Sequence, residues 1–350
     1  AETTEVPGLL AKLEPYRRWA VSRLEGPPPA SMRPARTSLH MDLARLHFGV
    51  LPPEGFARLH AAILAAPPDQ VRVIAAELES AAPEMAESFW TVLDQSTAHR
   101  EILAAGAVVA RHDPEDPRWE SHASLVSEAL LASSPSHTSE WIENLAPVGR
   151  WLVGPLRQFF TRSSVAVPGE AQSPHIVQQR HIAASALATH LRDDSAEVSR
   201  LLVFHAADAS EFQSLFEPLL AAPMQSVAHM RSHLEGLTNS QASGPDRDAS
   251  GPLQGRRLLP SASMANAIIA TLLLTDRPDL MRSKLKRAAD GTLRSRLVHR
   301  LSELGVSVEV VGKLLMSESE PDVRAALLLS LGEYPRSTVP QKLLLSVEEQ

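Results

Sequence analysis

The feature that most constrains the fold of this chain is that parts of its sequence resemble one another. Residues 13–24 (LEPYRRWAVSRL) align without gaps on residues 145–156 (LAPVGRWLVGPL). Leu, Pro, Arg, Trp, Val and Leu occupy matching positions, and Trp is too rare in this sequence for the match to be expected by chance. Internal similarity of this kind is typical of repeat architectures, in which each unit buries its apolar face against the next.

Two further sets of segments support the same interpretation. Residues 102–113 (ILAAGAVVARHD) resemble residues 182–193 (IAASALATHLRD), and an Arg, Arg100 or Arg180, stands shortly before each. The third set comprises EWIENLAPV around Trp141, EFQSLFEPL around Phe212 and RLVHRLSEL around Leu297. The units recur at intervals of tens of residues, and each has room for two pairs of short helices, the size of HEAT-type repeats.

The residue types predict helices rather than strands. Leu, Val and Ile recur at the spacing of one helix face, while Ala and Ser allow close approach of neighbouring helices. Only 4% of residues are aromatic and only 16 are Gly, which disfavours a β-sandwich or barrel, whereas 27 Pro mark many turns. We therefore predict an all-α fold, a right-handed α-solenoid of stacked helix pairs with HEAT-like repeats.

Stretches rich in Gly, Ser, Pro and Asp divide the predicted array. Such a composition is typical of surface loops and disordered insertions. The prediction is N-terminal helical repeats at 1–160, a loop insertion at 161–177, middle repeats at 178–235, a flexible insertion at 236–263 and C-terminal repeats at 264–350.

Several strings also resemble one known type of helical region. They are LEPYRRWA, LAAPPDQVRVIAAELES, AAGAVVARHDPEDPRW, SEWIENLAPVGRWLVGPL and LVHRLSELGV followed by EPDVRAALLLSLGEYP. They are similar to the HEAT-repeat-like segment of large multidomain bacterial proteins of planctomycete type, where it lies between a Ser/Thr kinase domain and a formylglycine-generating-enzyme-like domain. The resemblance implies a non-enzymatic, cytoplasmic scaffold or protein–protein interaction module within a larger signalling or sulfatase-modifying-like protein, with a protein or the flanking domains as partner. It assigns no site residue.

The motifs of common enzymes are missing. Without Cys there is no thiol nucleophile and no Cys-ligated metal. The one Gly-Lys pair, Gly312-Lys313, lacks the residues of a P-loop, and no kinase set or G-x-S-x-G elbow occurs. We therefore predict no catalytic residue, no cofactor and no enzymatic activity for these 350 residues. No apolar run is long enough to span a membrane, so membrane insertion is not expected.

One alternative function is a metal-dependent hydrolase or lyase. His229 and His233 form an H-x3-H pair that places both rings on one helix face, with Glu235 as a nearby carboxylate. A zinc protease of the H-E-x-x-H type would need Glu where Met230 stands, and no third ligand suggests itself from spacing. Surface or half-buried structural histidines are the preferred interpretation.

A second alternative is a helical-repeat protein that binds nucleic acid. The net charge of −7 disfavours this for the chain as a whole. One basic concentration nevertheless defines a candidate interaction surface, for which a solvated helix face is the competing interpretation. It consists of Arg282, Lys284, Lys286, Arg287, Arg294, Arg296 and Arg300.

The five Trp residues are expected to anchor the packing between repeats. Two Trp exposed in one groove would instead indicate a binding site for a peptide. They are Trp19, Trp90, Trp119, Trp141 and Trp151.

Overall fold

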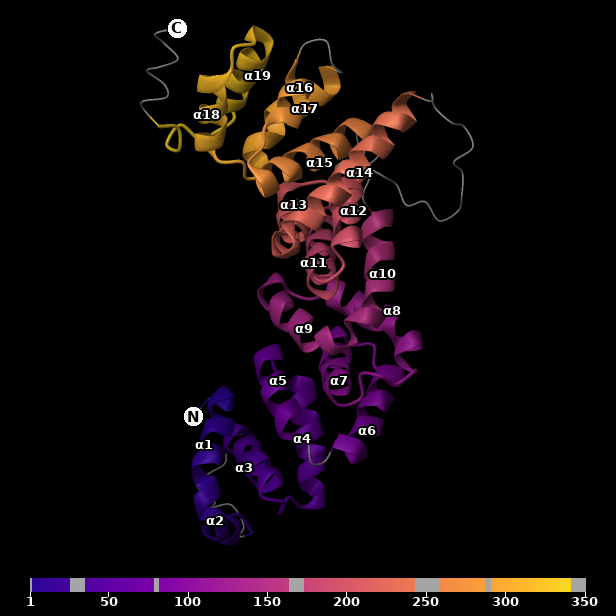
Figure 1. Ribbon diagram of the computed structural model, residues 1–350. Coiled ribbons are helices and arrows are strands. Elements are labelled where there is room, and N and C mark those ends of the chain that lie inside the picture. Colours follow the sequence, from indigo (N-terminus) through magenta and orange to yellow (C-terminus); the bar gives the residue numbers. More distant parts are fainter. Residues whose placement is uncertain are drawn as a thin grey trace. The chain divides into compact units, whose positions relative to one another are not determined.

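The computed structural model confirms that the protein is all-helical (Figure 1). No strand occurs in the residues it describes, which are 2–25, 35–78, 82–163, 173–242, 259–286 and 291–340. The chain forms two compact units, Ala1–Leu156 and Arg157–Gln350. The division falls close to the end predicted for the N-terminal repeats. Within the described residues, no helix is long and apolar enough to cross a lipid bilayer.

Unit 1 consists of α-helices joined by short 3₁₀ turns. Pro stands at the first or second position of several of them, where its missing N–H costs no hydrogen bond. The elements are η1 (Thr3–Glu5), α1 (Val6–Leu13), η2 (Glu14–Tyr16), α2 (Arg17–Leu24), α3 (Ala35–His47), α4 (Pro53–Ala65), α5 (Pro68–Glu77), α6 (Ala82–Gln95), α7 (His99–His112), α8 (Trp119–Leu131), η4 (Pro135–His137), α9 (Thr138–Asn144) and η5 (Ala146–Val148).

Helix α10 (Gly149–Arg162) runs across the division, and unit 2 continues with further helices of the same kind. They are α11 (Pro174–His190), α12 (Ser195–His205), α13 (Ala209–Phe216), η6 (Glu217–Ala221), α14 (Pro223–Ala242), α15 (Pro260–Thr275), α16 (Asp279–Leu285), α17 (Gly291–Glu303), α18 (Val308–Ser317) and α19 (Pro321–Leu331).

The core of unit 1 is built around α7. Every residue of α7 from Ile102 to Ala110 is buried, and the helix packs against α4, α5, α6, α8 and α9. Small side chains allow this many neighbours, because Ala and Gly leave room for close approach. Trp90 of α6 and Trp119 of α8 are both buried and meet edge to face, with ring centroids 5.3 Å apart.

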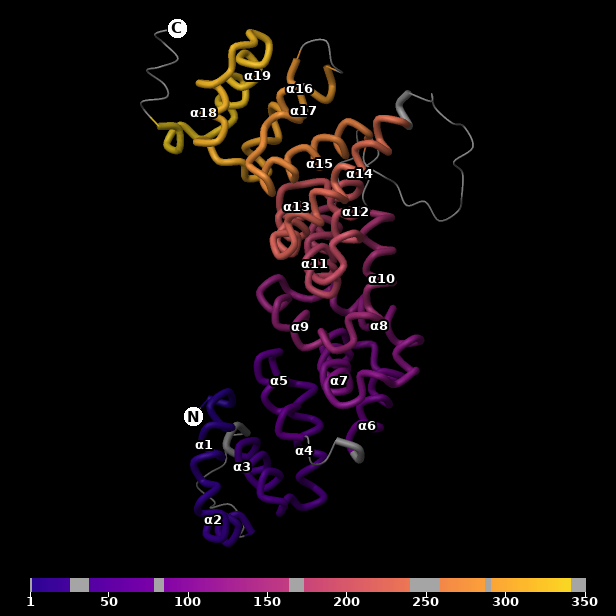
Figure 2. Tube along the Cα trace, in the orientation of Figure 1, coloured from indigo at the N-terminus to yellow at the C-terminus, as the bar shows by residue number. Residues whose placement is uncertain are grey.

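In unit 2 the corresponding central position belongs to α15. Its residues from Ser261 to Leu272 are all buried, and it packs against α12, α14 and α17 (Figure 2). A helix buried on all sides needs an apolar sequence throughout, and ANAIIATLLL supplies one. Two of the buried polar residues of α15 bond to backbone carbonyls, Thr271 to that of Ala267 and Asn266 to that of Leu202.

One order of elements occurs twice. A long helix, a second helix, a short third helix and a 3₁₀ turn follow one another from α7 to η5 and again from α11 to η6, with the extra turn η4 before the third helix in the first stretch. In both places the first helix contacts the third helix and the turn. We call these stretches the α7–η5 segment and the α11–η6 segment.

The predicted insertions are only partly described. Residues 164–172 and 243–258 lie outside the described residues. Helix α14 extends to Ala242 and α15 begins at Pro260, so both helices reach into the predicted insertion at 236–263. Pro260 occupies the first position of α15, and the carbonyl of Leu259 accepts from the amides of Ala262 and Ser263. The helix therefore begins earlier than the Gly-rich composition indicated.

The Trp residues differ in burial. Trp90, Trp119 and Trp141 are buried, as expected for packing anchors. Trp151 is half-buried and donates from Nε1 to the carbonyl of Pro114 at 3.2 Å. Trp19 is 61% exposed, so the expectation is wrong for this residue.

Candidate functional site

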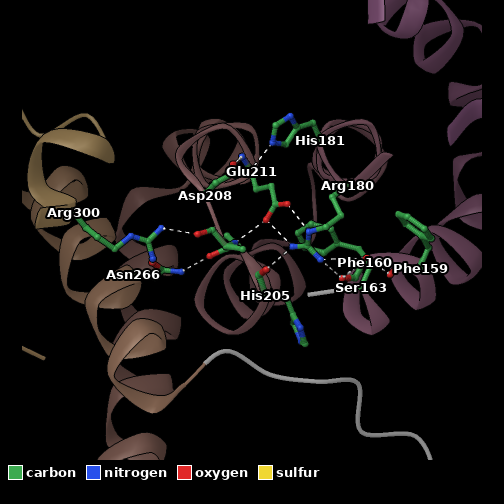
Figure 3. Close-up of polar contacts among 12 residues, drawn as sticks. Phe159, Phe160, Ser163, Arg180, His181, His205, Asp208, Glu211, Asn266 and Arg300 are labelled. Atoms are coloured by element: carbon green, nitrogen blue, oxygen red, sulfur yellow. Dashed lines mark hydrogen bonds and ion pairs between the residues drawn. The ribbon is translucent and has the colours of Figure 1, made fainter. Parts of the chain in front are cut away.

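The strongest candidate for a functional site is a polar cluster at the turn between α12 and α13 (Figure 3). Arg180 of α11 and Glu211 of α13 are each only 1% exposed and form a two-pronged ion pair. Nε of Arg180 donates to Oε1 of Glu211 at 2.6 Å, and Nη2 donates to Oε2 at 2.7 Å. The planar guanidinium matches the carboxylate, which makes such pairs the strongest of protein hydrogen bonds.

The remaining donors of Arg180 bind carbonyl groups at helix ends. Nη1 donates to the carbonyl of Phe160 in the last turn of α10 at 2.8 Å, and Nη2 donates to that of His205 at the end of α12 at 2.9 Å. The guanidinium carbon lies 4.6 Å from the centre of the Phe160 ring. One buried side chain therefore joins three helices to α11 and satisfies carbonyls that a helix end leaves unpaired.

A second pair lies beside the first, nearer to solvent. Asp208 caps α13, because its Oδ1 accepts from the amide of Glu211 at 3.0 Å. Its Oδ2 lies 2.7 Å from Nε2 of His181. Burial opposes ionisation of Asp208, but the bonds from the Glu211 amide and His181 outweigh it and lower the pKa of this carboxyl group.

A third pair extends the cluster toward α15 and α17. Asn266 is fully buried and donates to the carbonyls of Leu202 and Ala206, each at 3.0 Å. Its Oδ1 accepts from Nη1 of Arg300 at 2.7 Å. Removal from water lowers the pKa of Arg300. The α12–α13 turn is thus bonded by side chains from three other helices.

Three residues of the cluster form the only possible metal-binding group among the residues described. His181, Asp208 and Glu211 each offer one ligand atom within 4.8 Å of the others. Both oxygens of Glu211 already bind the guanidinium of Arg180, and Oε2 also accepts from the amide of Ala207. A cation here would face a fixed positive charge and would have to displace these bonds. The donor set does not fit a metal ion.

The His181–Asp208 pair is also incomplete as catalytic machinery. It resembles the imidazole and carboxylate of a catalytic triad, in which the imidazole activates a hydroxyl. Within the described part of the chain, no Ser or Thr hydroxyl forms a hydrogen bond with His181. Among the residues described, the pair therefore lacks the hydroxyl that a triad would activate.

The predicted histidine pair lies elsewhere in unit 2. His229 and His233 are half-buried on α14, and Nε2 of His229 is buried without a hydrogen-bond partner. The ring of His233 packs edge-on against Phe204, with centroids 5.3 Å apart. Among the described residues, this pair is not part of a group of three ligand residues. Its surroundings are those of packed side chains.

The residues of the predicted basic surface mostly bind neighbouring parts of unit 2. Arg282 forms a two-pronged pair with Glu318 at 2.7 and 3.0 Å, and this bond lowers the pKa of Glu318 to about 2. Lys286 lies 4.0 Å from Glu320.

The rest of that surface is similarly engaged. Arg294 donates to the carbonyls of Leu285 and Asp322, Arg296 donates to the hydroxyl of Ser261, and Arg300 is buried in the cluster described above. Lys284 is half-exposed, and Arg287 lies outside the described residues. The structure thus does not gather the seven residues into one open basic face within the part of the chain it describes.

Sequence reasoning missed the cluster of Arg180, Asp208 and Glu211, although a signal for it existed. Arg180 stands at the same place before its segment as Arg100 does. Glu211 aligns with Glu140 when EFQSLFEPL is placed on EWIENLAPV. An Arg and a Glu that recur in two similar segments could have been proposed as a pair.

The comparisons with known proteins add no assignment. No protein-family model matches the chain, and searches of curated proteins and of solved structures gave no significant match.

Proposed function

We propose that this chain is a non-enzymatic helical-repeat scaffold that presents binding surfaces to another protein. The observation that carries the proposal is the use of the charged cluster in unit 2. Arg180, Glu211 and Asn266 are buried, and their bonds go to each other and to the ends of neighbouring helices. An active site instead keeps at least one reactive group directed toward substrate.

The element order supports the architecture that we propose, an α-solenoid of HEAT-like helix pairs. In unit 2, α11 contacts α13, α12 contacts α14, α15 contacts α17, and α17 contacts α19. Contacts between every second helix are what stacked helix pairs require. Buried bonds from one helix to the ends of the next would fix the angle between successive pairs.

We further propose that the chain is an arm within a larger protein, on the basis of the resemblance to planctomycete-type multidomain proteins. Its neighbours would be kinase-like and formylglycine-generating-enzyme-like modules, or a separate protein. An immunoblot of the source cells tests this part. A polypeptide well above 38.0 kDa supports it, and a band at 38.0 kDa contradicts it.

The scaffold role itself is tested by site-specific cross-linking in those cells. A photo-reactive amino acid replaces one exposed residue at a time, at Trp19, Met224 and Lys313, with buried Leu202 as the matched control. We expect the same cross-linked protein to recur from at least one exposed site and not from Leu202. Cross-links that are absent from every exposed site would contradict a scaffold.

A further inference from the structure

Unit 1 contains a solvent-accessible pocket of about 370 Å³ at the start of α7. His99 and Arg100 line it from α7, and the turn before α9 contributes Ser133, Ser134 and His137. Leu103, Trp141 and the start of α5 provide its apolar side. Of the described residues that line it, none is acidic, whereas three can carry positive charge.

Two residues that line the pocket, Arg100 and His137, align in sequence with Arg180 and Asp208 of the α11–η6 segment. Arg100 precedes residues 102–113 as Arg180 precedes residues 182–193. Arg100 donates to the carbonyl of Ala65, the last residue of α4, while Arg180 donates to a carbonyl in the last turn of α10. Both guanidinium groups therefore hold the C-terminal end of another helix.

The two segments differ in the acidic partners. Position 137 precedes α9 as position 208 precedes α13, and His137 stands where the second segment has Asp208. His137 makes no capping bond to α9. Glu140 aligns with Glu211, but its carboxylate accepts from the hydroxyl of Ser139 at 3.1 Å and forms no ion pair with Arg100. Among described groups, Arg100 thus has no carboxylate on its remaining N–H donors.

We propose that this pocket binds a carboxylate group from outside the chain. The carboxylate would lie against Arg100 as Glu211 lies against Arg180, and His99, His137 and the two serines would face it from the rim. An apolar group attached to the carboxylate would pack on Leu103 and the Pro67-Pro68 turn. The ligand class is a small apolar carboxylic acid, or an acidic residue or C-terminus of a peptide. The inference stands apart from the scaffold role, since either can fail without the other.

Phenylacetate is the test ligand, because it joins one carboxylate to one apolar ring. Binding to the full chain is followed by ligand-observed NMR, with neutral phenylacetamide as the matched control. We expect a dissociation constant of about 1 mM or tighter for phenylacetate and at least about tenfold weaker binding of the amide. Two peptides distinguish a side-chain carboxylate from a C-terminal one. Both are N-acetylated and contain one Glu and one Phe, but one is C-amidated and the other has a free C-terminus.

Two substitutions connect the binding to the pocket. Arg100→Gln removes the guanidinium and should weaken phenylacetate binding about tenfold or more. His137→Asp restores the residue type found at position 208 and should abolish binding by placing a carboxylate at the site. Arg111→Gln on the exposed face of the same helix should leave the affinity unchanged.

The proposal is overturned if phenylacetate fails to bind at 10 mM or so, far above the expected dissociation constant. It is also overturned if Arg100→Gln and Arg111→Gln bind equally well, or if phenyl phosphate binds and phenylacetate does not. Thermal unfolding of each variant shows that the fold is retained, which is expected because Arg100 and His137 are both exposed.

Discussion

The α7–η5 and α11–η6 segments have the same order of helices, but their aligned arginines, Arg100 and Arg180, have different surroundings. In the second segment the chain supplies its own carboxylates: Glu211 pairs with buried Arg180, and Asp208 caps the helix that carries Glu211. In the first segment Arg100 lies at the wall of an open pocket beside His137. The first segment has His137 at the position aligned with Asp208, and its aligned Glu140 accepts from Ser139 instead of pairing with Arg100.

The two segments agree at apolar positions and differ at charged ones. Aligned apolar positions such as Trp141 and Phe212 are buried in both segments, so the packing between helices is preserved. The charged positions differ between the segments: Arg180 and Glu211 are buried, whereas Arg100 is exposed. The α7–η5 segment lacks the buried ion pair of the α11–η6 segment and has a solvent-accessible pocket.

The largest expected effect comes from removing the acidic partner in each segment. Glu211→Ala leaves the guanidinium of Arg180 buried without its counter-charge and should lower the free energy of unfolding by about 3–5 kcal/mol. Glu140→Ala, at the aligned position, should change it by no more than about 0.5 kcal/mol. Chemical denaturation of both variants measures the contrast. Equal losses of stability in the two variants would show that Glu211 contributes no more to the fold than Glu140 does.

The double variant Arg180→Met with Glu211→Leu sharpens this result. Buried ion pairs are often replaced by apolar residues with little loss, because the pair must first give up its hydration. We expect the double variant to recover at least half of the stability lost in Glu211→Ala. No recovery would mean that the bonds from Arg180 to helix ends matter more than its charge partner.

A smaller effect concerns His190, which aligns with Ala110 of α7. Burial, together with the nearby charge of Arg192, lowers the pKa of His190 to about 4. The unfolded chain takes up a proton below pH 6.5, but the folded chain does not until about pH 4. Stability should therefore fall by up to about 3 kcal/mol as the pH decreases through this window.

The His190→Gln variant isolates that contribution. It should show a shallower loss of stability between pH 6.5 and 4 than the unmodified protein, whatever its stability at neutral pH. The free energy of unfolding is measured by denaturant titration at several pH values. Parallel curves for the two proteins would mean that His190 is protonated in the folded state.

The smallest expected effect lies at the caps of α9 and α13. Asp208→Ala removes the bond to the amide of Glu211 and should cost about 1 kcal/mol. His137→Asp places a good capping residue before α9 and should gain about 0.5–1 kcal/mol. Opposite signs in the two variants, measured by thermal unfolding, are the expected result. A loss in both would show that α9 does not start as α13 does.

The sequence predicted the helical fold because apolar periodicity reports which residues face a core. It predicted three of the five Trp anchors for the same reason, but not the exposure of Trp19, since an isolated segment does not show what packs beside it. Arg180 and Glu211 were missed because they are distant in sequence and each resembles a surface residue by type. His229 and His233 were selected by spacing alone, which cannot indicate whether a third ligand lies near.

The basic residues of α16 and α17 show the same limitation. A run of Arg and Lys indicates charge but not its partner. Arg282 and Lys286 meet Glu318 and Glu320, which come from the turn before α19. Only the folded arrangement shows that these charges neutralise one another, and so composition overestimated how open the candidate surface is.

The claim that Arg180 requires a carboxylate partner is tested most directly by adding a carboxylate from solution to the Glu211→Ala variant and measuring whether its stability is restored. The substitution removes a group the size of acetate, so sodium acetate should restore stability and sodium chloride at equal ionic strength should not. Both salts are compared in an Arg100→Gln background, which removes the unit 1 pocket as a second binding site. We expect acetate to stabilise the double variant Glu211→Ala/Arg100→Gln more than it stabilises the single variant Arg100→Gln. Equal stabilisation of the two proteins by acetate would contradict the claim that these arginine residues form binding sites for a carboxylate.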